Sequence, residues 1–188
     1  MIKCTAKLKS ISPYGQSRHY NEPKLEKESA KDYEARTWRL RAHTNQTGQM
    51  FIPPMAFKNC LSEAAKYLSM QIPGKGKATY TKHFEAGVMV TDPLPLNIHV
   101  DKVPGLWLFV PADGKRGSGK RVEKCFPVIP EWQGDVAFYI LDETITEDVF
   151  RYHLEQAGKF IGIGFFRPRN NGYFGRFEVV KMTWETNQ

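Results

Sequence analysis

The sequence of 188 residues is poor in cysteine, and its three cysteines, Cys4, Cys60 and Cys125, lie far apart. Their odd number and the lack of a CxxC pair argue against a disulfide framework and against a zinc site. No apolar run approaches the roughly 20 residues of a membrane span, and the N-terminus lacks the apolar centre of a signal peptide. We therefore expect a cytoplasmic protein without membrane contact.

Common motifs of nucleotide, metal and hydrolytic sites are also missing. The sequence contains no GxxxxGK[ST], HExxH or GxSxG, and Gly162 and Gly164 fall within a strand-like pattern rather than at a strand-to-helix turn. Acidic residues at 142–148 are explained by the start of a helix, where its dipole favours negative charge. We expect no cofactor and no bound metal.

Positive charge is what the chain has in surplus. It carries 27 Lys and Arg against 20 Asp and Glu, a net charge of +7, and 13% of its residues are aromatic. A surplus of this size favours a polyanionic partner. Several aromatics stand beside basic residues in expected loops, which suits stacking on unpaired bases. The composition therefore favours single-stranded RNA or DNA as the partner.

Hydrophobic periodicity predicts both strands and helices. Apolar and polar residues alternate over 2–9 and 35–44, which is typical of half-buried strands, with Trp38 and Leu40 on one face. The polar stretch 13–34 is expected to be a long loop. A period of 3.6 residues predicts helices over 52–71 and 142–158, the second with Gly158 as a candidate C-cap. Further strands are expected at 85–92, 96–100, 134–141, 159–166 and 175–185, and 105–130 is expected to be a hairpin.

The order of these elements is strand, helix, two or more strands, helix, strand. A β-α-β-β-α-β order is typical of the ferredoxin-like or RRM-like fold, so we predict an α+β fold with this core. We expect one domain over 1–188, with a long N-terminal loop insertion at about 13–45 and a basic β-hairpin inserted at about 105–130. The tip of the hairpin is basic and carries Lys115, Arg116, Lys120, Arg121 and Lys124 against Asp113 and Glu123.

The segment "GIGFFRPRNNGYFGRF", residues 162–177, is dense in glycine, arginine and aromatics. Glycines inside a strand pattern usually mark bulges or the close approach of a backbone or ligand, and uncovered backbone N–H groups in such concavities bind anions. One interpretation is an exposed-backbone cradle with Arg167 and Arg169 at its lip. The alternative is an ordinary hairpin with a glycine-rich turn.

Two segments resemble the RAMP superfamily, which supplies backbone subunits of CRISPR effector complexes and their repeat-processing endoribonucleases. "GIGFFRPRNNGYFGRF" looks like the family's C-terminal glycine-rich loop, and "FIPPMAFKNCLSEAAKYL" at 51–68 looks like its first-helix segment. The basic hairpin is similar to the protruding thumb of the backbone subunits. The chain departs from the family in its short length and in Pro-Pro-Met where glycine and serine are more usual. A stand-alone relative, such as a viral protein that binds single-stranded DNA, fits that length as well.

The leading hypothesis is a non-enzymatic protein that binds single-stranded nucleic acid and assembles along it, as a homo-oligomer or as a subunit of a nucleoprotein complex. Its expected contacts fall into three groups. Phosphates would meet Lys58, Arg167, Arg169 and Arg176, the flanks would be lined by Lys75, Lys77, Lys115, Arg116, Lys120 and Arg121, and bases would stack on Tyr80 and Tyr173.

Two alternatives remain open at this point. One is a metal-independent endoribonuclease of the repeat-processing type, with His19 or Tyr20 in acid–base roles. The other is a viral structural or assembly protein whose positive face meets other proteins.

Overall fold

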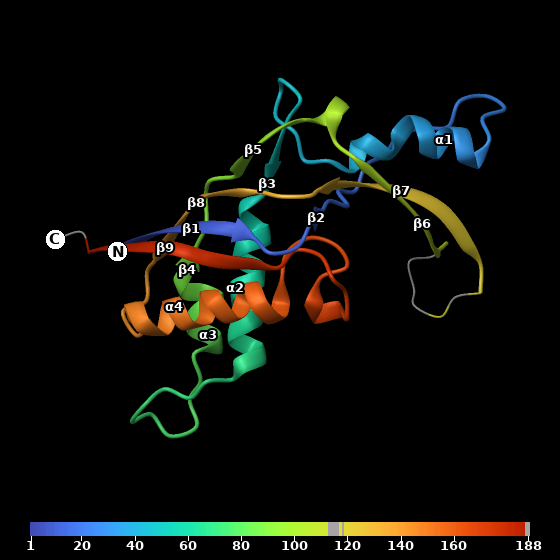
Figure 1. Cartoon of the computed structure of the whole chain (residues 1–188). Coiled ribbons are helices and arrows are strands. Elements are labelled where there is room, and N and C mark those ends of the chain that lie inside the picture. The colour runs from blue at the N-terminus through green and yellow to red at the C-terminus, as the bar shows by residue number, and fades with distance from the viewer. Residues whose placement is uncertain (113–116, 118, 187–188) are drawn as a thin grey trace.

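The computed structural model describes residues 1–112, 117 and 119–186. Its centre is a four-stranded antiparallel sheet in the order β4-β8-β1-β9 (Figure 1). The strands are β1 (Ile2–Ser10), β4 (Val88–Met89), β8 (Gln133–Ile140) and β9 (Phe177–Thr186). The first and last strands of the chain therefore lie side by side, and the expected strands at 2–9, 134–141 and 175–185 are confirmed.

One face of this sheet is apolar because its strands alternate. Cys4, Ala6 and Leu8 of β1 are fully buried. Alternate residues of a strand point to the same face of a sheet, and helices cover this face. Helices α2 (Pro54–Leu68) and α4 (Glu147–Gln156) pack on it. Phe150 of α4 meets Phe138 of β8 at 5.3 Å between ring centroids.

Both expected long helices are present, and their ends follow the local sequence. Pro53 and Pro54 begin α2, where a missing N–H group costs little. Thr146 caps α4 through its side chain, but Gly158 does not end this helix. The chain continues through a π-helical turn, Ala157–Ile161, and leaves it at Gly162, whose φ is +72°. Gly158 is needed for packing instead, because a Cβ there would lie 2.1 Å from the Phe177 carbonyl oxygen of β9.

The N-terminal insertion is more ordered than its composition predicts. The predicted strand over 35–44 is wrong: this stretch is the end of α1 (Ala30–Thr37) and a 3-10 turn, Trp38–Arg41. Trp38 is buried while Leu40 is 41% exposed, so the two do not share a face. The start of α1 is set by Ser29, whose side chain accepts a hydrogen bond from the Asp32 N–H group.

The remaining elements frame the sheet. The hairpin expected at 105–130 is confirmed as β6 (Gly105–Pro111) paired with β7 (Arg121–Ile129), and β2 (Tyr14–Gly15) pairs with β7. A two-stranded sheet joins β3 (Gln49–Ile52) to β5 (Leu94–His99). Two predictions are wrong in detail, because 85–92 contains the end of helix α3 (Thr81–Gly87), and 159–166 forms no strand. Short 3-10 turns cover Val100–Lys102 and Pro168–Asn170.

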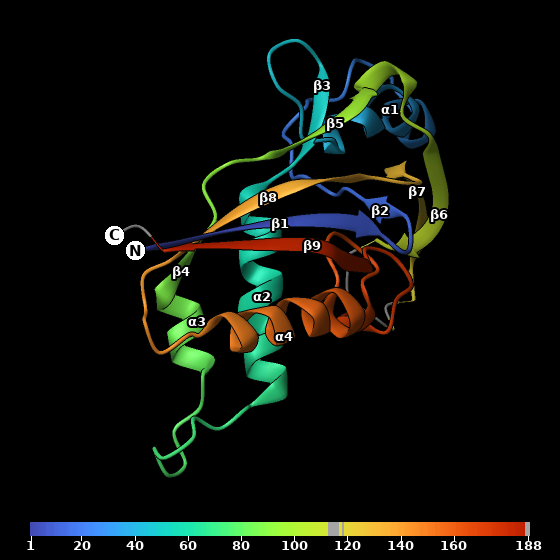
Figure 2. The ribbon, with the colours of Figure 1, turned by 60° about the vertical axis from the view of Figure 1, so that its left-hand side comes forward.

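The α+β class is thus confirmed, with antiparallel sheets throughout the described residues. Figures 1 and 2 show the β6–β7 hairpin and α1 at one end of the molecule, and the connection between α2 and α3 at another. Within the described part of the chain, no helix combines the length and apolar character needed to cross a membrane.

Candidate nucleic-acid interface

The β6–β7 hairpin carries large apolar side chains on both of its faces. Trp107 and Phe109 of β6 are 42% and 66% exposed. On the other face, Leu106, Leu108 and Val110 are half-buried. A two-stranded arm that leaves rings of this size in solvent is unusual for a purely structural element, since exposed apolar patches usually mark binding surfaces.

The glycine-rich loop, residues 162–176, is neither a hairpin turn nor an uncovered cradle. Most of its backbone N–H groups are hydrogen-bonded within the protein: Gly162 donates to Ala157, Ile163 to Gly175, Phe165 to Gly15 and Gly175 to Pro13. Further bonds of this kind are donated by Asn170, Asn171, Gly172 and Phe174 to backbone oxygens and by Arg176 to the Ser12 hydroxyl. The expectation of a free row of anion-binding N–H groups is therefore wrong.

The fold brings this loop against the hairpin. Phe165 of the loop lies 4.7 Å from Phe126 of β7 between ring centroids, and Phe165 in turn contacts Phe166 and Phe174. Between the two segments lies a cavity of about 800 Å³, which we call the hairpin groove. Its lining is mainly apolar and comprises Leu106, Leu108, Phe109, Val110, Pro111, Gly117, Gly119, Arg121, Phe166, Gly172, Tyr173 and Phe174.

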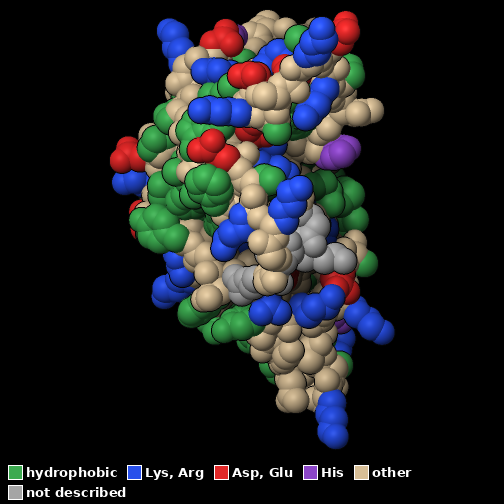
Figure 3. Space-filling view, turned by 90° about the vertical axis from the view of Figure 1, so that its right-hand side faces the viewer, with side chains coloured by type: hydrophobic (Ala, Val, Ile, Leu, Met, Phe, Trp, Pro, Cys, Tyr) green, Lys and Arg blue, Asp and Glu red, His purple; other side chains and the backbone are tan. Residues whose placement is uncertain are grey.

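Exposed rings and one arginine stand at the groove. Phe166 and Tyr173 are 46% and 62% exposed, and the expected stacking residue Tyr173 is therefore accessible. Arg121 is exposed and donates one bond to the Phe109 carbonyl oxygen at 3.2 Å, which holds its guanidinium over the hairpin backbone. Figure 3 shows this end of the molecule, where Lys and Arg side chains are spread over the whole face and hydrophobic side chains gather at mid-height.

Sequence reasoning missed Trp107, Phe109 and Phe166 as candidate contacts. The signal was present in "GLWLFVP", where large apolar residues occupy both faces of one strand immediately before a basic tip. A two-stranded hairpin with apolar side chains on both faces needs another segment or a ligand to cover each face. In this fold the glycine-rich loop forms one side of the groove, which Phe109 also lines, whereas Trp107 lies outside the lining and stays exposed.

Arg167 and Arg169 turn toward helix α2 rather than into the groove. Both pair with one carboxylate, Glu63, at 2.7 and 3.2 Å. Arg169 also lies over the Tyr67 ring, 5.7 Å from its centroid. Two guanidinium groups on one carboxylate leave a net positive charge here, so the site still attracts anions, but more weakly than two free arginines would.

Lys58 and Arg176 are committed to internal bonds. The Lys58 ammonium donates to the Ser62 hydroxyl and to the carbonyl oxygens of Phe84 and Glu85, at 2.7 to 2.9 Å, and burial lowers its pKa. It thereby ties α2 to the last turn of α3. Arg176 donates to carbonyl oxygens of Lys159 and Tyr173. Neither arrangement resembles the free phosphate contact that we expected.

Tyr80 cannot stack on a base, because it is only 4% exposed and packs against the His83 and His153 rings. Lys75 and Lys77 are exposed, but their loop lies away from the hairpin (Figures 1 and 2). The structure therefore separates this basic loop from the groove.

The hairpin tip is described only in part. Lys115 and Arg116 lie outside the described residues. The carbonyl oxygen of Lys120 accepts a hydrogen bond from the Ala112 N–H group, which closes the described end of the β6–β7 ladder.

The residues of the nuclease alternative are not arranged as a catalytic pair. His19 is exposed, and the Tyr20 hydroxyl is bonded to the Thr37 hydroxyl at 2.9 Å. A general base needs a positioned partner, and no described side chain hydrogen-bonds the His19 ring. No group of three or more His, Cys, Asp or Glu side chains in the described ranges is arranged to hold a metal ion.

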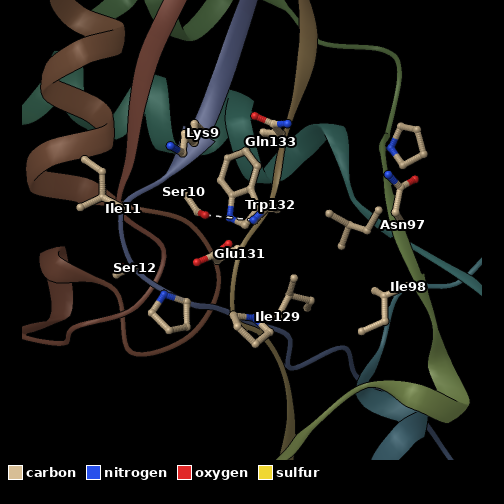
Figure 4. A pocket seen from close by; sticks show the side chains of 14 residues that line it. Lys9, Ser10, Ile11, Ser12, Asn97, Ile98, Ile129, Glu131, Trp132 and Gln133 are labelled. Carbon is tan, nitrogen blue, oxygen red and sulfur yellow. Dashed lines mark hydrogen bonds between the residues drawn. The ribbon is translucent and has the colours of Figure 1, made fainter.

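A second cavity, of about 670 Å³, lies between the end of β1, β5 and the β7–β8 connection (Figure 4). Its lining mixes apolar residues such as Ile98 and Ile129 with Lys9, Glu131 and Asn97. One positive and one negative side chain leave it without the charge surplus that a nucleic-acid site needs. The hairpin groove is therefore the better candidate.

Of the comparisons with known proteins, the comparison of structures finds a match and the comparisons of sequence do not. No family model matches the chain, and no curated protein matches it in sequence. Among solved structures, it is similar to the crystal structure of Cmr6 from Pyrococcus furiosus, with a TM-score of 0.47 and 15% sequence identity over 95% of this chain and 99% of that one. A likeness of this strength says nothing about function, so we infer function from the surface of this chain itself.

Proposed function

We propose that this protein is a non-enzymatic binder of single-stranded nucleic acid and that bases stack in the hairpin groove. The observation that carries the proposal is the convergence of exposed rings, Phe109, Phe166 and Tyr173, beside Arg121 in a cavity of about 800 Å³. Unpaired bases offer flat faces to such rings, and duplexes do not. The net charge of +7 supplies long-range attraction for the phosphates.

We also propose that the core is ferredoxin-like. Six elements support this assignment, because β1, α2, β4, β8, α4 and β9 follow one another as strand, helix, strand, strand, helix, strand. Numbering only the four strands, the sheet order is 4-1-3-2, all antiparallel. Together with the resemblance of two segments to the RAMP superfamily, this suggests a subunit of a nucleoprotein complex that assembles along the strand.

Fluorescence anisotropy with labelled single strands of RNA and DNA measures binding affinity and tests whether bases stack in the hairpin groove. Base stacking on an aromatic side chain contributes about 1–3 kcal/mol, so Tyr173→Ala should weaken binding about 5- to 160-fold. Phe109→Ala should act in the same direction. Tyr152→Ala removes an exposed tyrosine ring that lines neither cavity, 45% exposed on α4, and should leave the affinity unchanged.

Salt dependence and cleavage separate this proposal from its alternatives. A plot of log affinity against log salt should be linear with a negative slope. Affinity that does not respond to salt or to Tyr173→Ala contradicts the groove proposal. Cleavage of RNA in EDTA that is lost in a His19→Ala variant favours the endoribonuclease, and defined oligomers with no gel shift favour the assembly protein.

A further inference from the structure

A third cavity lies beside α1, on the side of β7 away from the glycine-rich loop. It measures about 490 Å³, and we call it the α1 pocket. The residues 17–24, helix α1 and strand β7 build its walls, so it depends on the insertion that the sequence pattern predicted to be a loop. Its lining comprises Ser17, Arg18, His19, Tyr20, Lys24, Ala30, Tyr33, Glu34, Arg41, Val122, Glu123 and Lys124.

The carboxylates around α1 are already occupied by arginines. Arg36 forms ion pairs with Glu22 and Glu28, with nitrogen–oxygen distances of 2.9 and 2.8 Å. Arg41 forms an ion pair with Glu34, whose Oε1 also accepts a hydrogen bond from the Cys125 N–H group. Glu34 therefore neutralises Arg41, the buried cation of the lining, and Glu22 and Glu28 pair with Arg36, which lies outside the lining.

Three cations of the pocket have no such partner. Within the described residues, Arg18, Lys24 and Lys124 have no carboxylate oxygen within 4 Å of their side-chain nitrogens. Counting the lining side chains, these three and Arg41 carry +4, and Glu34 and Glu123 carry −2, which leaves +2. A concave surface with uncompensated charge of one sign concentrates ions of the other.

Two fixed aromatic rings stand beside these cations. The Tyr20 hydroxyl is bonded to Thr37, and the Tyr33 hydroxyl donates to the Glu22 carbonyl oxygen at 2.7 Å. The Lys24 ammonium lies 5.8 Å from the centre of the Tyr33 ring. The rings are thus held in place before any ligand arrives, which lowers the entropic cost of binding.

The α1 pocket and the hairpin groove share one strand. Arg121 lines the groove, and Val122, Glu123 and Lys124 line the pocket. At about 3.3 Å per residue, Arg121 and Lys124 are about 10 Å apart along β7. Because the two cavities lie on different sides of β7, a single extended ligand that contacts both has to pass over this strand.

We propose that the α1 pocket binds the phosphodiester backbone of the strand whose bases stack in the hairpin groove. This inference rests on the proposed function and extends the footprint past β7 to Arg18, Lys24 and Lys124. The recognising chemistry is phosphate anions against three unpaired cations, with Tyr20 or His19 beside the ribose or base. An acidic protein segment is the competing occupant, and the experiment separates the two.

The test compares two strand lengths in a charge-neutralised variant, Arg18→Gln with Lys24→Gln. Both side chains are exposed, so the fold should be kept, and a thermal melt checks this. Each lost phosphate contact lowers the salt slope for a single strand by about 0.7, so the slope should fall by about 1.4 with a strand of about 12 nucleotides. With a dinucleotide, whose one internucleotide phosphate cannot reach the pocket while its bases stack in the groove, slope and affinity should match the wild type.

Two further variants sharpen the comparison. Glu123→Gln removes a negative side chain from the lining and should strengthen binding of the long strand only. Lys159→Glu with Lys181→Glu changes two exposed lysines that line neither cavity. This control should lower the slope for both lengths equally or not at all.

Three other outcomes contradict the inference, and each differs from the others in what is bound and by which protein. Unchanged slopes for both lengths in the Arg18 and Lys24 variant remove the pocket from the footprint and leave the groove standing. Binding of neither length by the wild-type protein contradicts the proposed function itself. Binding of a poly-glutamate peptide that the variant loses, with strand binding unchanged, assigns the pocket to an acidic protein.

Discussion

The buried ion pair between Glu34 and Arg41 gives the sharpest prediction about stability. Both side chains are more than nine-tenths buried, and the Arg41 Nη1 lies 2.6 Å from the Glu34 Oε1. The same arginine donates to the Cys125 carbonyl oxygen at 3.0 Å, and the Cys125 N–H group donates to Glu34 at 2.7 Å. The pair therefore fastens α1 to strand β7 and shapes one wall of the α1 pocket.

We expect Glu34→Gln to cost about 3–5 kcal/mol of unfolding free energy, because it leaves the Arg41 charge buried without its counter-charge. For a chain of this length, 1 kcal/mol corresponds to about 2–4 °C in melting temperature, so the midpoint should fall by about 6–20 °C. Urea unfolding followed by circular dichroism measures the free energy. Glu147→Gln, which breaks an exposed pair with Arg151 within α4, should cost less than about 1 kcal/mol.

A double variant tests whether the charge pair is responsible. Replacing both partners by apolar residues, Glu34→Leu with Arg41→Met, should cost less than Glu34→Gln, since no unpaired charge remains and only the Cys125 N–H and carbonyl groups lose their side-chain partners. A Glu34→Gln protein within about 1 kcal/mol of wild type would refute the reasoning. It would mean that water or a shift of α1 solvates Arg41 at little cost.

Four further outcomes are expected from the contacts of single residues. Tyr80→Ala should lower the unfolding free energy by about 3–5 kcal/mol through loss of a buried ring, with strand affinity unchanged in anisotropy. Lys58→Met should cost about 1–3 kcal/mol in urea unfolding and leave the salt slope of binding as it was. Burial lowers the pKa of His153, so the unfolded chain binds a proton at this residue more readily than the folded chain does. The unfolding free energy should therefore be constant above pH ~6.5 and decrease below it, and His153→Gln should reduce that decrease. Gly175→Ala should destabilise by more than about 1 kcal/mol, because its φ is +78° and a Cβ would lie 1.8 Å from the Ile163 oxygen.

Local sequence was a good guide wherever structure depends on near neighbours. The alternation in residues 2–9 and the 3.6-residue period over 52–71 are both signals between residues a few positions apart. The arms of the hairpin also follow from their own pattern. These signals suffice to predict the α+β class and the order of the main elements.

Local sequence misled where a distant segment decides the outcome. The stretch 35–44 alternates like a strand, but Glu34 and Arg41 both bond to the backbone of Cys125 in β7, which favours α1. Residues 159–166 read as a strand, yet β1 already pairs with β8 and β9, and Gly162 turns the chain away. Tertiary contacts of this kind routinely outweigh local propensity.

The sequence by itself determined the charge surplus, the positions of the basic and aromatic residues, and those strands and helices that follow from local periodicity. Only the tertiary structure decided which of those residues are available. It buries Tyr80, pairs Arg167 and Arg169 with Glu63, and brings Tyr173 and Phe109 into the lining of one groove. The physical reason is that burial and ion pairing depend on residues far apart along the chain, which a pattern of neighbours does not record.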